Sequence, residues 1–265
     1  MNEFQGKLLE MLTWLHEFLQ KNHLNYYVIG GTMLGAVRHQ GFIPWDDDAD
    51  IAMPRKDYEK LIDLLKDPVD HYVVESVHSP AKDYSYLIAK LYDTNTTLID
   101  ASKTLPKRGL FIDIFPLDGI GETKEDGVKN YKKIKRMCHL HAVKVCRRKK
   151  GRKWWKNLAA ACGGLLPVRH KNLARKIDAA CNRLSFEDSA YVGTLHSGLG
   201  EREIMPKSVY GTPTPYTFEG ITVFGPEQYD DYLTRLYRNW RQLPPEDKRD
   251  SGHDFVFVDL KTPYL

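Results

Sequence analysis

Two neighbouring segments dominate this 265-residue sequence: Gly30-Gly31-Thr32-Met33-Leu34-Gly35-Ala36-Val37-Arg38-His39 and, after a short loop, Trp45-Asp46-Asp47-Asp48-Ala49-Asp50-Ile51. The β-prone residues 26–29 precede the two glycines, and apolar residues at helical spacing follow them. This order predicts a strand, a tight turn and a helix, with Thr32 as the helix N-cap. The alternation of polar and apolar residues over 48–53 predicts a second, half-buried strand, and Pro54 then opens another helix.

The acidic run predicts a site for a divalent metal ion, because so much like charge in one place requires a cation. Alternate residues of a strand point to one face, so Asp48 and Asp50 point together, and Asp46 joins them if the extended geometry begins early. Oxygen ligands that leave positions for water and phosphate suit Mg²⁺, or Mn²⁺, better than zinc. An EF-hand does not fit, because Ile51 stands where its glycine belongs. The remaining alternative is a solvated acidic loop.

A phosphate site is expected opposite this metal site. Gly30 and Gly31 let the backbone approach an anion, and the start of the following helix favours negative charge. Arg38 is either a bidentate phosphate ligand or an exposed surface residue. Asp113 lies in an apolar strand and is expected to bind metal or to act as general base. Lys90 is likewise a charge within a strand, where it either binds phosphate or faces outward at an edge.

The rest of the chain predicts an α+β fold, a mixed β-sheet flanked by helices with a helical second lobe. Residues 1–121 contain an N-terminal amphipathic helix and strands expected at 72–77, 86–92, 96–100 and 110–114, with Asp118 as a local cap. Residues 122–200 are predicted to form a basic helical lobe. Residues 201–265 are predicted to form a hairpin over 216–224 and a helix from Pro226 to Trp240, which pack back on the core.

Charge is distributed unevenly along the chain. The formal net charge is +4, but residues 129–176 contain 17 Lys and Arg and no acid, which leaves 22 basic against 35 acidic residues elsewhere. The longest uncharged run in this region, 157–168, is shorter than the roughly 20 residues of a membrane span. No secretory signal opens the chain, so a cytoplasmic location is expected. The four cysteines form no CxxC pair and are expected to be reduced.

The basic segment 147–168 has three interpretations. It combines dense Lys and Arg with Trp154 and Trp155 and then an apolar stretch, which is the composition of an interfacial helix. It could therefore dock on an anionic membrane or on an anionic acceptor. The alternatives are a solvated helix face and a nucleic-acid patch with stacking aromatics. No nucleic-acid partner is expected, because membrane or acceptor docking is favoured.

The two opening segments closely resemble the LicD family. The resemblance extends to Met53-Pro54-Arg55 with Tyr58, to Asp113-Ile114-Phe115-Pro116-Leu117-Asp118, and to Leu243-Pro244-Pro245-Glu246 with His253-Asp254. It implies a nucleotidyltransferase-type fold related to the fukutin-type proteins. Under it, Gly30, Gly31 and Thr32 match the glycine turn, Asp48 and Asp50 the metal-binding pair, and Asp113 the third acid. One departure is Thr32, where the superfamily usually has Ser; the hydroxyl is retained.

The resemblance implies a phosphotransferase, which the acidic run would make Mg²⁺-dependent and the basic segment would place at the inner face of the plasma membrane. It would move phosphocholine from CDP-choline to a sugar hydroxyl of a teichoic acid or another lipid-linked cell-surface glycan. Within the same fold, the alternatives are transfer of ribitol phosphate or glycerol phosphate from another CDP-alcohol, or transfer of a nucleotidyl group. The alternative from a different functional class is a catalytically silent module that binds nucleic acid or an anionic polymer through the basic segment.

Overall fold

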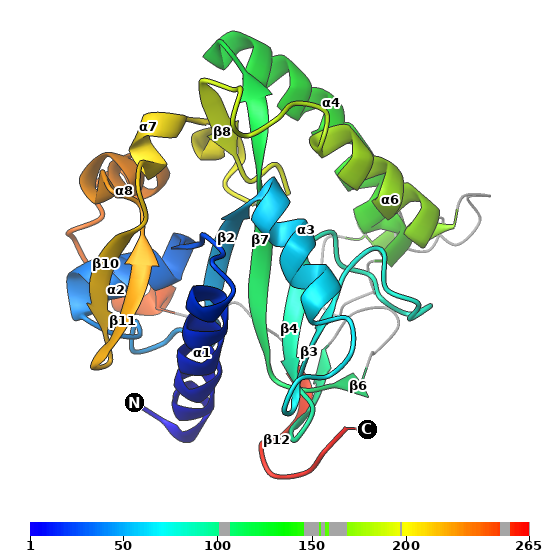
Figure 1. The fold of residues 1–265 in the computed structure, drawn as a ribbon, viewed down its shortest axis with the longest axis vertical. Helices are drawn as coiled ribbons and strands as arrows, with labels where there is room; N and C mark the ends of the chain where they lie inside the picture. The colour runs from blue at the N-terminus through cyan, green and yellow to red at the C-terminus, as the bar shows by residue number, and fades with distance from the viewer. Residues whose placement is uncertain are drawn as a thin grey trace.

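The computed structural model describes residues 1–100, 107–145, 154, 157–158, 169–196, 198–249 and 255–264. Its helices surround a mixed β-sheet, which confirms the α+β class (Figure 1). The helices are α1 (Glu3–Lys21), α2 (Gly30–His39), α3 (Arg55–Leu64), α4 (Lys124–Val145), α6 (His170–Cys181), α7 (Lys207–Tyr210) and α8 (Tyr229–Tyr237), with short 3₁₀ helices η1 (Gly200–Glu203) and η2 (Glu246–Lys248). The strands are β1 (Tyr27–Val28), β2 (Asp50–Pro54), β3 (Tyr72–Glu75), β4 (Ala89–Asp93), β5 (Thr97–Asp100), β6 (Lys107–Arg108), β7 (Phe111–Gly121), β8 (Tyr191–Gly193), β9 (Met205–Pro206), β10 (Thr214–Phe218), β11 (Ile221–Gly225) and β12 (Phe255–Asp259).

The central sheet brings charged residues from distant segments into register. Its strand order is β1-β2-β7-β4-β3, in which β2 and β7 run parallel and the other neighbours run antiparallel. Asp50, at the start of β2, lies opposite Asp113 of β7, which lies opposite Lys90 of β4. Because residues paired in this way point to the same face of a sheet, the three side chains share one side.

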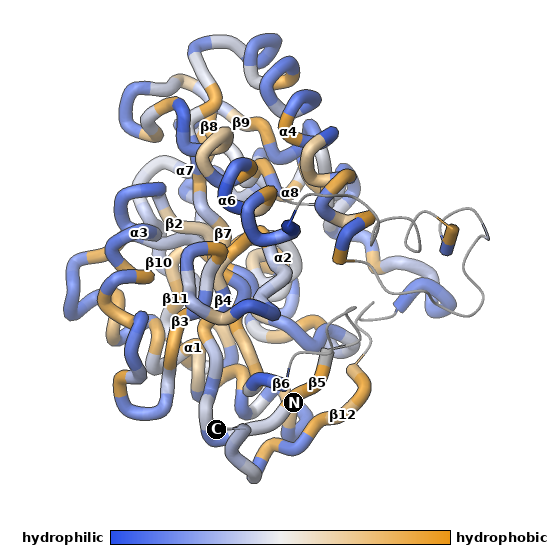
Figure 2. The backbone as a smooth tube through the Cα atoms, turned by 90° about the vertical axis from the view of Figure 1, so that its right-hand side faces the viewer, coloured by the Kyte–Doolittle hydropathy of each residue, from blue (hydrophilic) through white to orange (hydrophobic). Residues whose placement is uncertain are grey.

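Most strands lie within a few residues of their expected ranges, with two clear corrections. β4 begins at Ala89 rather than Tyr86, and β7 continues to Gly121 rather than ending at Ile114. β7 is long because its second half pairs with β8, which also pairs with β9. The short strands β6, β8, β9 and β12 are not predicted by the sequence. β12 pairs with β5, and β5 with β6, in a small sheet near both chain ends (Figure 2).

Helix α1 fixes the acidic loop to the core. A capping box starts it, since the Asn2 side chain accepts from the Gln5 N–H at 2.8 Å and the Gln5 side chain accepts from the Asn2 N–H at 3.2 Å. The Gln5 amide then donates to the carbonyls of Asp46 at 2.9 Å and Ile43 at 3.3 Å. Its apolar stripe is fully buried, as the helical spacing predicts: Leu8, Met11, Leu12, Leu15 and Leu19.

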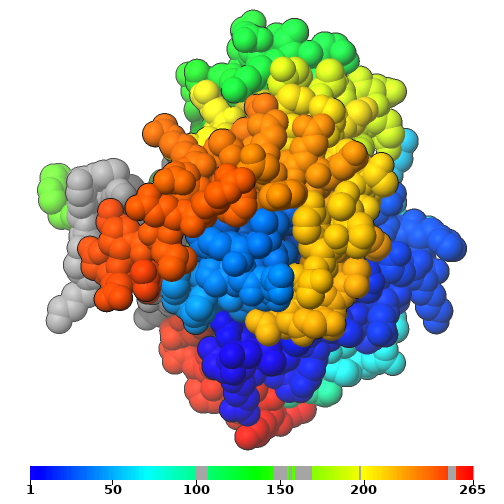
Figure 3. All heavy atoms as spheres, turned by 90° about the vertical axis from the view of Figure 1, so that its left-hand side faces the viewer, coloured from blue at the N-terminus to red at the C-terminus, as the bar shows by residue number. Residues whose placement is uncertain are grey.

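The hairpin β10–β11 and helix α8 lie against α2 (Figure 3). The hairpin turns at Glu219-Gly220, as expected, and the Glu219 carboxylate accepts from the Phe42 N–H at 3.1 Å. α8 spans Tyr229–Tyr237, somewhat shorter than the predicted helix. The C-terminal part of the chain therefore surrounds the glycine turn, although it is distant from it in sequence.

Helices α4 and α6 pack together at one end of the molecule, as expected for the helical lobe (Figure 1). Their buried residues form a small core with Ile120 of β7, including Tyr131 and Ile134 of α4 and Leu173 and Ile177 of α6. Cys138 and Cys181 are free thiols. Most of the predicted docking segment 147–168 lies outside the described residues. In the described ranges, no helix has the length and apolar character needed to cross a membrane.

His141 of α4 should make the fold sensitive to acid. The side chain is 2% exposed, and its Nε2 has no hydrogen-bond partner among the described residues. Burial, with smaller contributions from His170 and His196, lowers the pKa of His141 to about 4. Below about pH 6.5 the unfolded chain therefore binds a proton here that the folded chain does not, and stability is lost as the pH falls towards 4.

We expect His141→Phe to reduce the loss of unfolding free energy between pH 7 and pH 5 by about 2 kcal/mol. Urea unfolding at the two pH values measures this difference. His139→Phe is the matched control, because His139 is exposed on the same helix. The same pH dependence in the wild type and the His141 variant would contradict the prediction.

Candidate active site

The glycine turn is shaped by its tertiary neighbours. Gly30 has a φ of +56°, a backbone conformation that favours glycine, and its N–H donates to the Tyr232 hydroxyl of α8 at 3.0 Å. The sequence prediction that Thr32 caps α2 is wrong. The helix begins at Gly30 after Ile29, and the Thr32 hydroxyl instead accepts from the Asp50 N–H at 2.8 Å. Thr32 thus ties the glycine turn to the acidic strand.

The missing side chains of both glycines make room for carboxylates. A Cβ added to Gly31 would lie 2.8 Å from Asp46 Oδ2, and one added to Gly30 would lie 3.3 Å from Asp50 Oδ2. The start of α2, where backbone N–H groups point outward, therefore faces the acidic run directly. The phosphate and metal sites that the sequence places at these two segments stay predictions.

The acidic residues gather around Asp50. Burial raises the pKa of Asp50 well above its usual value, and the neighbouring Asp48, Asp113 and Asp46 raise it further, whereas Lys90 opposes them. Asp46, Asp48 and Asp113 therefore lie near enough to Asp50, on two strands and a loop, to act on its charge. Their mutual repulsion makes this a place where a bound cation would be strongly favoured.

Lys90 is the cation that partly balances these acids. Its ammonium forms an ion pair with Asp113 and lies 3.4 Å from the centre of the Phe111 ring and 4.4 Å from that of Tyr86. Lys90 is 3% exposed and lies on β4, between β3 and β7, so the interpretation as an outward-facing edge residue is wrong. Its pairing with a phosphate stays a prediction.

Arg38 lies at the end of α2, where its Nη1 donates to the Trp240 carbonyl at 2.8 Å. The side chain is half-buried, and burial lowers its pKa. This contact joins α2 to the segment after α8. The Arg38 Nε also donates to His39 Nδ1 at 3.4 Å, and phosphate binding by the remaining donors of Arg38 stays a prediction.

The C-terminal segments add two site residues that the sequence does not predict. The Tyr237 hydroxyl would lie 3.8 Å from a Cβ at Gly30. Burial raises the pKa of Tyr237, and Asp50 and Glu203 raise it further, so the phenol stays neutral. Glu203 is 4% exposed and accepts from the Thr194 hydroxyl at 3.0 Å. A buried acid in a short 3₁₀ helix carries no local signal that could identify it.

The donor set fits magnesium better than zinc. In the part of the chain that the structure describes, no three His, Cys, Asp or Glu side chains are already arranged to enclose a metal ion. Zinc prefers nitrogen and sulfur ligands, whereas Mg²⁺ is commonly held by one or two carboxylates and completed by water and phosphate. The close carboxylates Asp48 and Asp50 supply the oxygen ligands that Mg²⁺ or Mn²⁺ needs.

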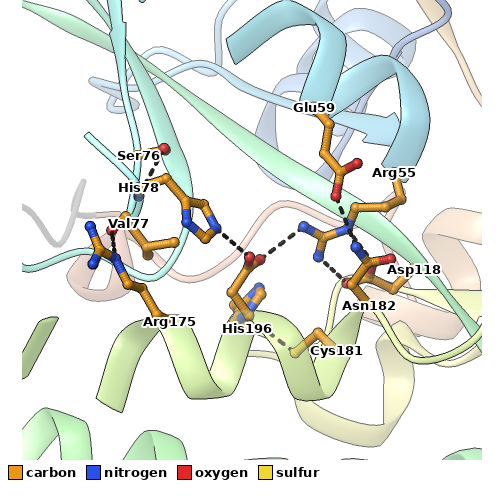
Figure 4. A network of polar contacts seen from close by, with 11 residues as sticks. Arg55, Glu59, Ser76, Val77, His78, Asp118, Arg175, Cys181, Asn182 and His196 are labelled. Atoms are coloured by element: carbon orange, nitrogen blue, oxygen red, sulfur yellow. Dashed lines mark hydrogen bonds and ion pairs between the residues drawn. The ribbon is translucent and has the colours of Figure 1, made fainter. Parts of the chain in front are cut away.

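A second polar network holds the site-bearing strands in place (Figure 4). Arg55, just after β2, donates to both oxygens of Asp118 on β7 at 2.7 and 2.8 Å and to Asp178 on α6 at 2.8 Å. His78 Nε2 lies 2.8 Å from the other oxygen of Asp178. The predicted role of Asp118 as a local cap is therefore wrong, because its carboxylate spans 63 residues of sequence to pair with Arg55.

The two acids of this network differ in their environment. Burial raises the pKa of Asp118, and its bonds to Arg55 only partly offset that effect. Burial also acts on Asp178, but Arg55 and His78 outweigh it and hold the pKa of Asp178 below its usual value. The buried guanidinium of Arg55, at the start of α3, therefore links the end of β2 to both β7 and α6.

Comparisons with known proteins identify a matching family model and several relatives. A family model described as "LicD/FKTN/FKRP, nucleotidyltransferase domain" matches residues 23–156. The "Lipopolysaccharide cholinephosphotransferase LicD" of Haemophilus influenzae is 28% identical over 260 residues, which cover 96% of each chain. An uncharacterized protein of Rickettsia prowazekii is 47% identical over 58 residues, 22% of each chain. Another, from Rickettsia typhi, is 50% identical over 50 residues, which cover 19% of this chain and 16% of its own.

Proposed function

The chain belongs to the LicD/FKTN/FKRP nucleotidyltransferase-domain family, and we propose that it is a phosphotransferase that moves phosphocholine from CDP-choline to a sugar hydroxyl of a cell-surface glycan. The observation that carries this proposal is the group of carboxylates around Asp50, which faces the glycine turn at the start of α2. The relative of nearly equal length from H. influenzae is named as a cholinephosphotransferase, which supports phosphocholine as the transferred group.

The proposed reaction breaks the donor diphosphate. The sugar hydroxyl oxygen attacks the phosphorus that carries choline, the bond from that phosphorus to the bridging oxygen breaks, and CMP leaves with the electron pair. The hydroxyl proton passes to a carboxylate, for which Asp113 is the candidate. The Gly30-Gly31-Thr32 turn would hold the donor phosphates, with the Gly31 N–H as donor because the Gly30 N–H is bonded to Tyr232, and with Arg38 and Lys90 as further candidates.

Asp48 and Asp50 would hold Mg²⁺, with Asp46 and Asp113 as further candidate ligands. The ion would supply neutralisation of the charge on the donor diphosphate and on the departing CMP. Thr32 supports this role indirectly, since its hydroxyl fixes the backbone of Asp50.

The test is product analysis with CDP-choline, Mg²⁺ and a glycan acceptor. Phosphocholine transfer releases CMP and adds phosphocholine to the acceptor mass, whereas nucleotidyl transfer from CDP-choline adds CMP to the acceptor and releases choline phosphate. Parallel reactions with CDP-ribitol and CDP-glycerol test the two other alcohol phosphates. If CDP-choline releases no CMP in the presence of the acceptor, the proposal is wrong.

Gly31→Ala should lower kcat/KM for the donor about 10²-fold, because the added Cβ would lie 2.8 Å from Asp46 Oδ2 and displace that carboxylate. Steady-state rates of CMP release measure the effect. Gly6→Ala is the matched control, since a Cβ at Gly6 in α1 meets no atom within 4 Å. Equal losses in the two variants would indicate a general effect on folding and would contradict the prediction.

We further propose that the acceptor is lipid-linked, as in a teichoic acid precursor, and that the basic segment 147–168 docks the protein on the anionic inner face of the plasma membrane. Exposed basic residues of α4 continue this charge: Lys129, Lys132, Lys133 and Arg136. Each Lys or Arg near an anionic surface contributes about 1 kcal/mol to binding.

Replacing the six basic residues within 147–153 by Gln should weaken binding to vesicles with phosphatidylserine about 100-fold or more. Vesicle sedimentation at physiological salt measures this affinity. The matched control replaces the exposed Lys56, Lys60 and Lys66 around α3. Membrane docking by this segment is wrong if both variants bind as the wild type does, or if the wild type binds neutral vesicles equally well.

A further inference from the structure

A cavity of about 430 Å³ lies beside the glycine turn and Asp50. Gly30, Gly31 and Asp50 line the end that would hold the donor phosphates. The rest of the wall comes from separate parts of the chain: the segment before β4, the middle of β7, the loop after β8, η1 and the end of α8. A group attached to the reacting phosphate could therefore extend directly into this space.

Three aromatic side chains line the cavity. Phe115 follows Asp113 by two residues on β7, so both point to the same face of the sheet. Tyr237 is the last residue of α8, and its hydroxyl lies beside Gly30. Tyr86 already has its ring 4.4 Å from the Lys90 ammonium. All three are half-buried, in contrast to the fully buried aromatic core residues.

The charges of the cavity wall favour a cation. Asp50 and Glu203 are its acids, and none of the described residues that line it is Lys or Arg. Burial lowers the pKa of His196 to about 4, so this residue adds no positive charge at neutral pH. An anionic glycan would meet these two acids, and the Lys90 ammonium beside Tyr86 is already paired with Asp113. Aromatic faces beside a carboxylate are instead the environment that binds a quaternary ammonium.

We infer that this cavity holds the trimethylammonium group of the donor, with Tyr86, Phe115 and Tyr237 as its aromatic wall and Glu203 as its counter-charge. The inference rests on the proposed function, because it assigns the choline end of CDP-choline. The chemistry agrees, since a two-carbon bridge joins the choline ammonium to its phosphate ester, and the cavity lies beside the turn that would hold that phosphate. These residues then select the donor alcohol, while the glycine turn and Asp50 serve any CDP-alcohol.

The test compares CDP-choline with CDP-3,3-dimethylbutanol, whose tert-butyl group has the shape of trimethylammonium without its charge. We expect wild-type kcat/KM to favour CDP-choline at least tenfold. Glu203→Gln and Phe115→Leu should each reduce this preference about tenfold, mainly by raising KM for CDP-choline and with little change for the neutral donor. Glu219→Gln, on the hairpin and outside the cavity wall, is the matched control.

Calorimetric titration of each donor into the wild type and both variants gives the same comparison without turnover, and thermal melts confirm that each variant folds. Equal preference in all proteins overturns the inference, although CMP release from CDP-choline would leave the proposed function intact. If the two variants instead raise KM for the acceptor and leave the donor preference unchanged, the cavity binds the sugar, and the inference is overturned. If CDP-choline releases no CMP, the proposed function is wrong, and a titration with choline phosphate against 3,3-dimethylbutyl phosphate still decides whether the cavity prefers the cation.

Discussion

Asp50→Asn should reduce the rate of CMP release from CDP-choline about 10³-fold or more, the largest effect expected for a single substitution in this protein. Asp50 stands where the glycine turn, β2 and β7 meet. Its N–H is held by Thr32, its carboxylate lies beside Gly30, and Asp113 is its partner in the sheet. The amide retains the shape but removes the charge that would hold Mg²⁺ against the donor diphosphate.

The loss of activity should occur without loss of the fold. Removing one of several neighbouring like charges relieves repulsion, so the Asn variant should melt at the temperature of the wild type or above it. Titration calorimetry should show weakened Mg²⁺ binding in the same variant. Asp47→Asn is the matched control. Asp47 belongs to the same acidic run, but it is not among the residues with the largest effect on the pKa of Asp50. Comparable activity in the Asp50 and Asp47 variants would show that the proposed metal site is wrong.

Arg55→Met should lower the free energy of unfolding by about 3–5 kcal/mol, the largest expected effect on stability. Arg55 is 5% exposed and forms three hydrogen bonds, two to Asp118 and one to Asp178. The methionine would leave Asp118, which is fully buried, as a charge without its guanidinium partner. Urea unfolding measures the change, which corresponds to a fall in melting temperature of about 10 °C for a chain of this size.

Two comparisons make this prediction specific. Lys56→Met alters the next residue, whose ion pair with Glu187 is exposed, and should cost less than about 1 kcal/mol. Adding Asp118→Asn to Arg55→Met should recover part of the lost stability, because the stranded charge is then removed. Additive losses in the double variant would show that Arg55 does not act through Asp118.

The parts of the site that depend on short spacing could be predicted from the sequence. Asp48 and Asp50 are two residues apart on one strand, and Gly30 and Gly31 directly precede an apolar helical pattern. Such patterns reflect strand alternation and helix initiation, which are local properties of the chain. The α+β class, α1, α2 and the hairpin follow from the same kind of signal and are confirmed by the structure.

The errors arise where a side chain has two suitable partners, one local and one distant. Thr32 has the chemistry of an N-cap but accepts from Asp50, and Asp118 has the chemistry of a turn residue but pairs with Arg55. Lys90 was compatible with an edge strand, yet its strand lies inside the sheet and its ammonium meets Asp113. Sequence patterns indicate which chemistry a residue offers, but the identity of its partner depends on strand order.

The amino-acid sequence by itself determined the chemistry of this protein: an acidic strand beside a glycine turn, and a third acid within a distant apolar strand. Only the tertiary structure decided that Asp50, Asp113 and Lys90 lie in register across β2, β7 and β4, and that Glu203 and Tyr237 approach the same point from the C-terminal part of the chain. The physical reason is that local patterns arise from backbone geometry over a few residues. Strand order and packing arise instead from burial of the whole apolar surface, which couples segments more than a hundred residues apart.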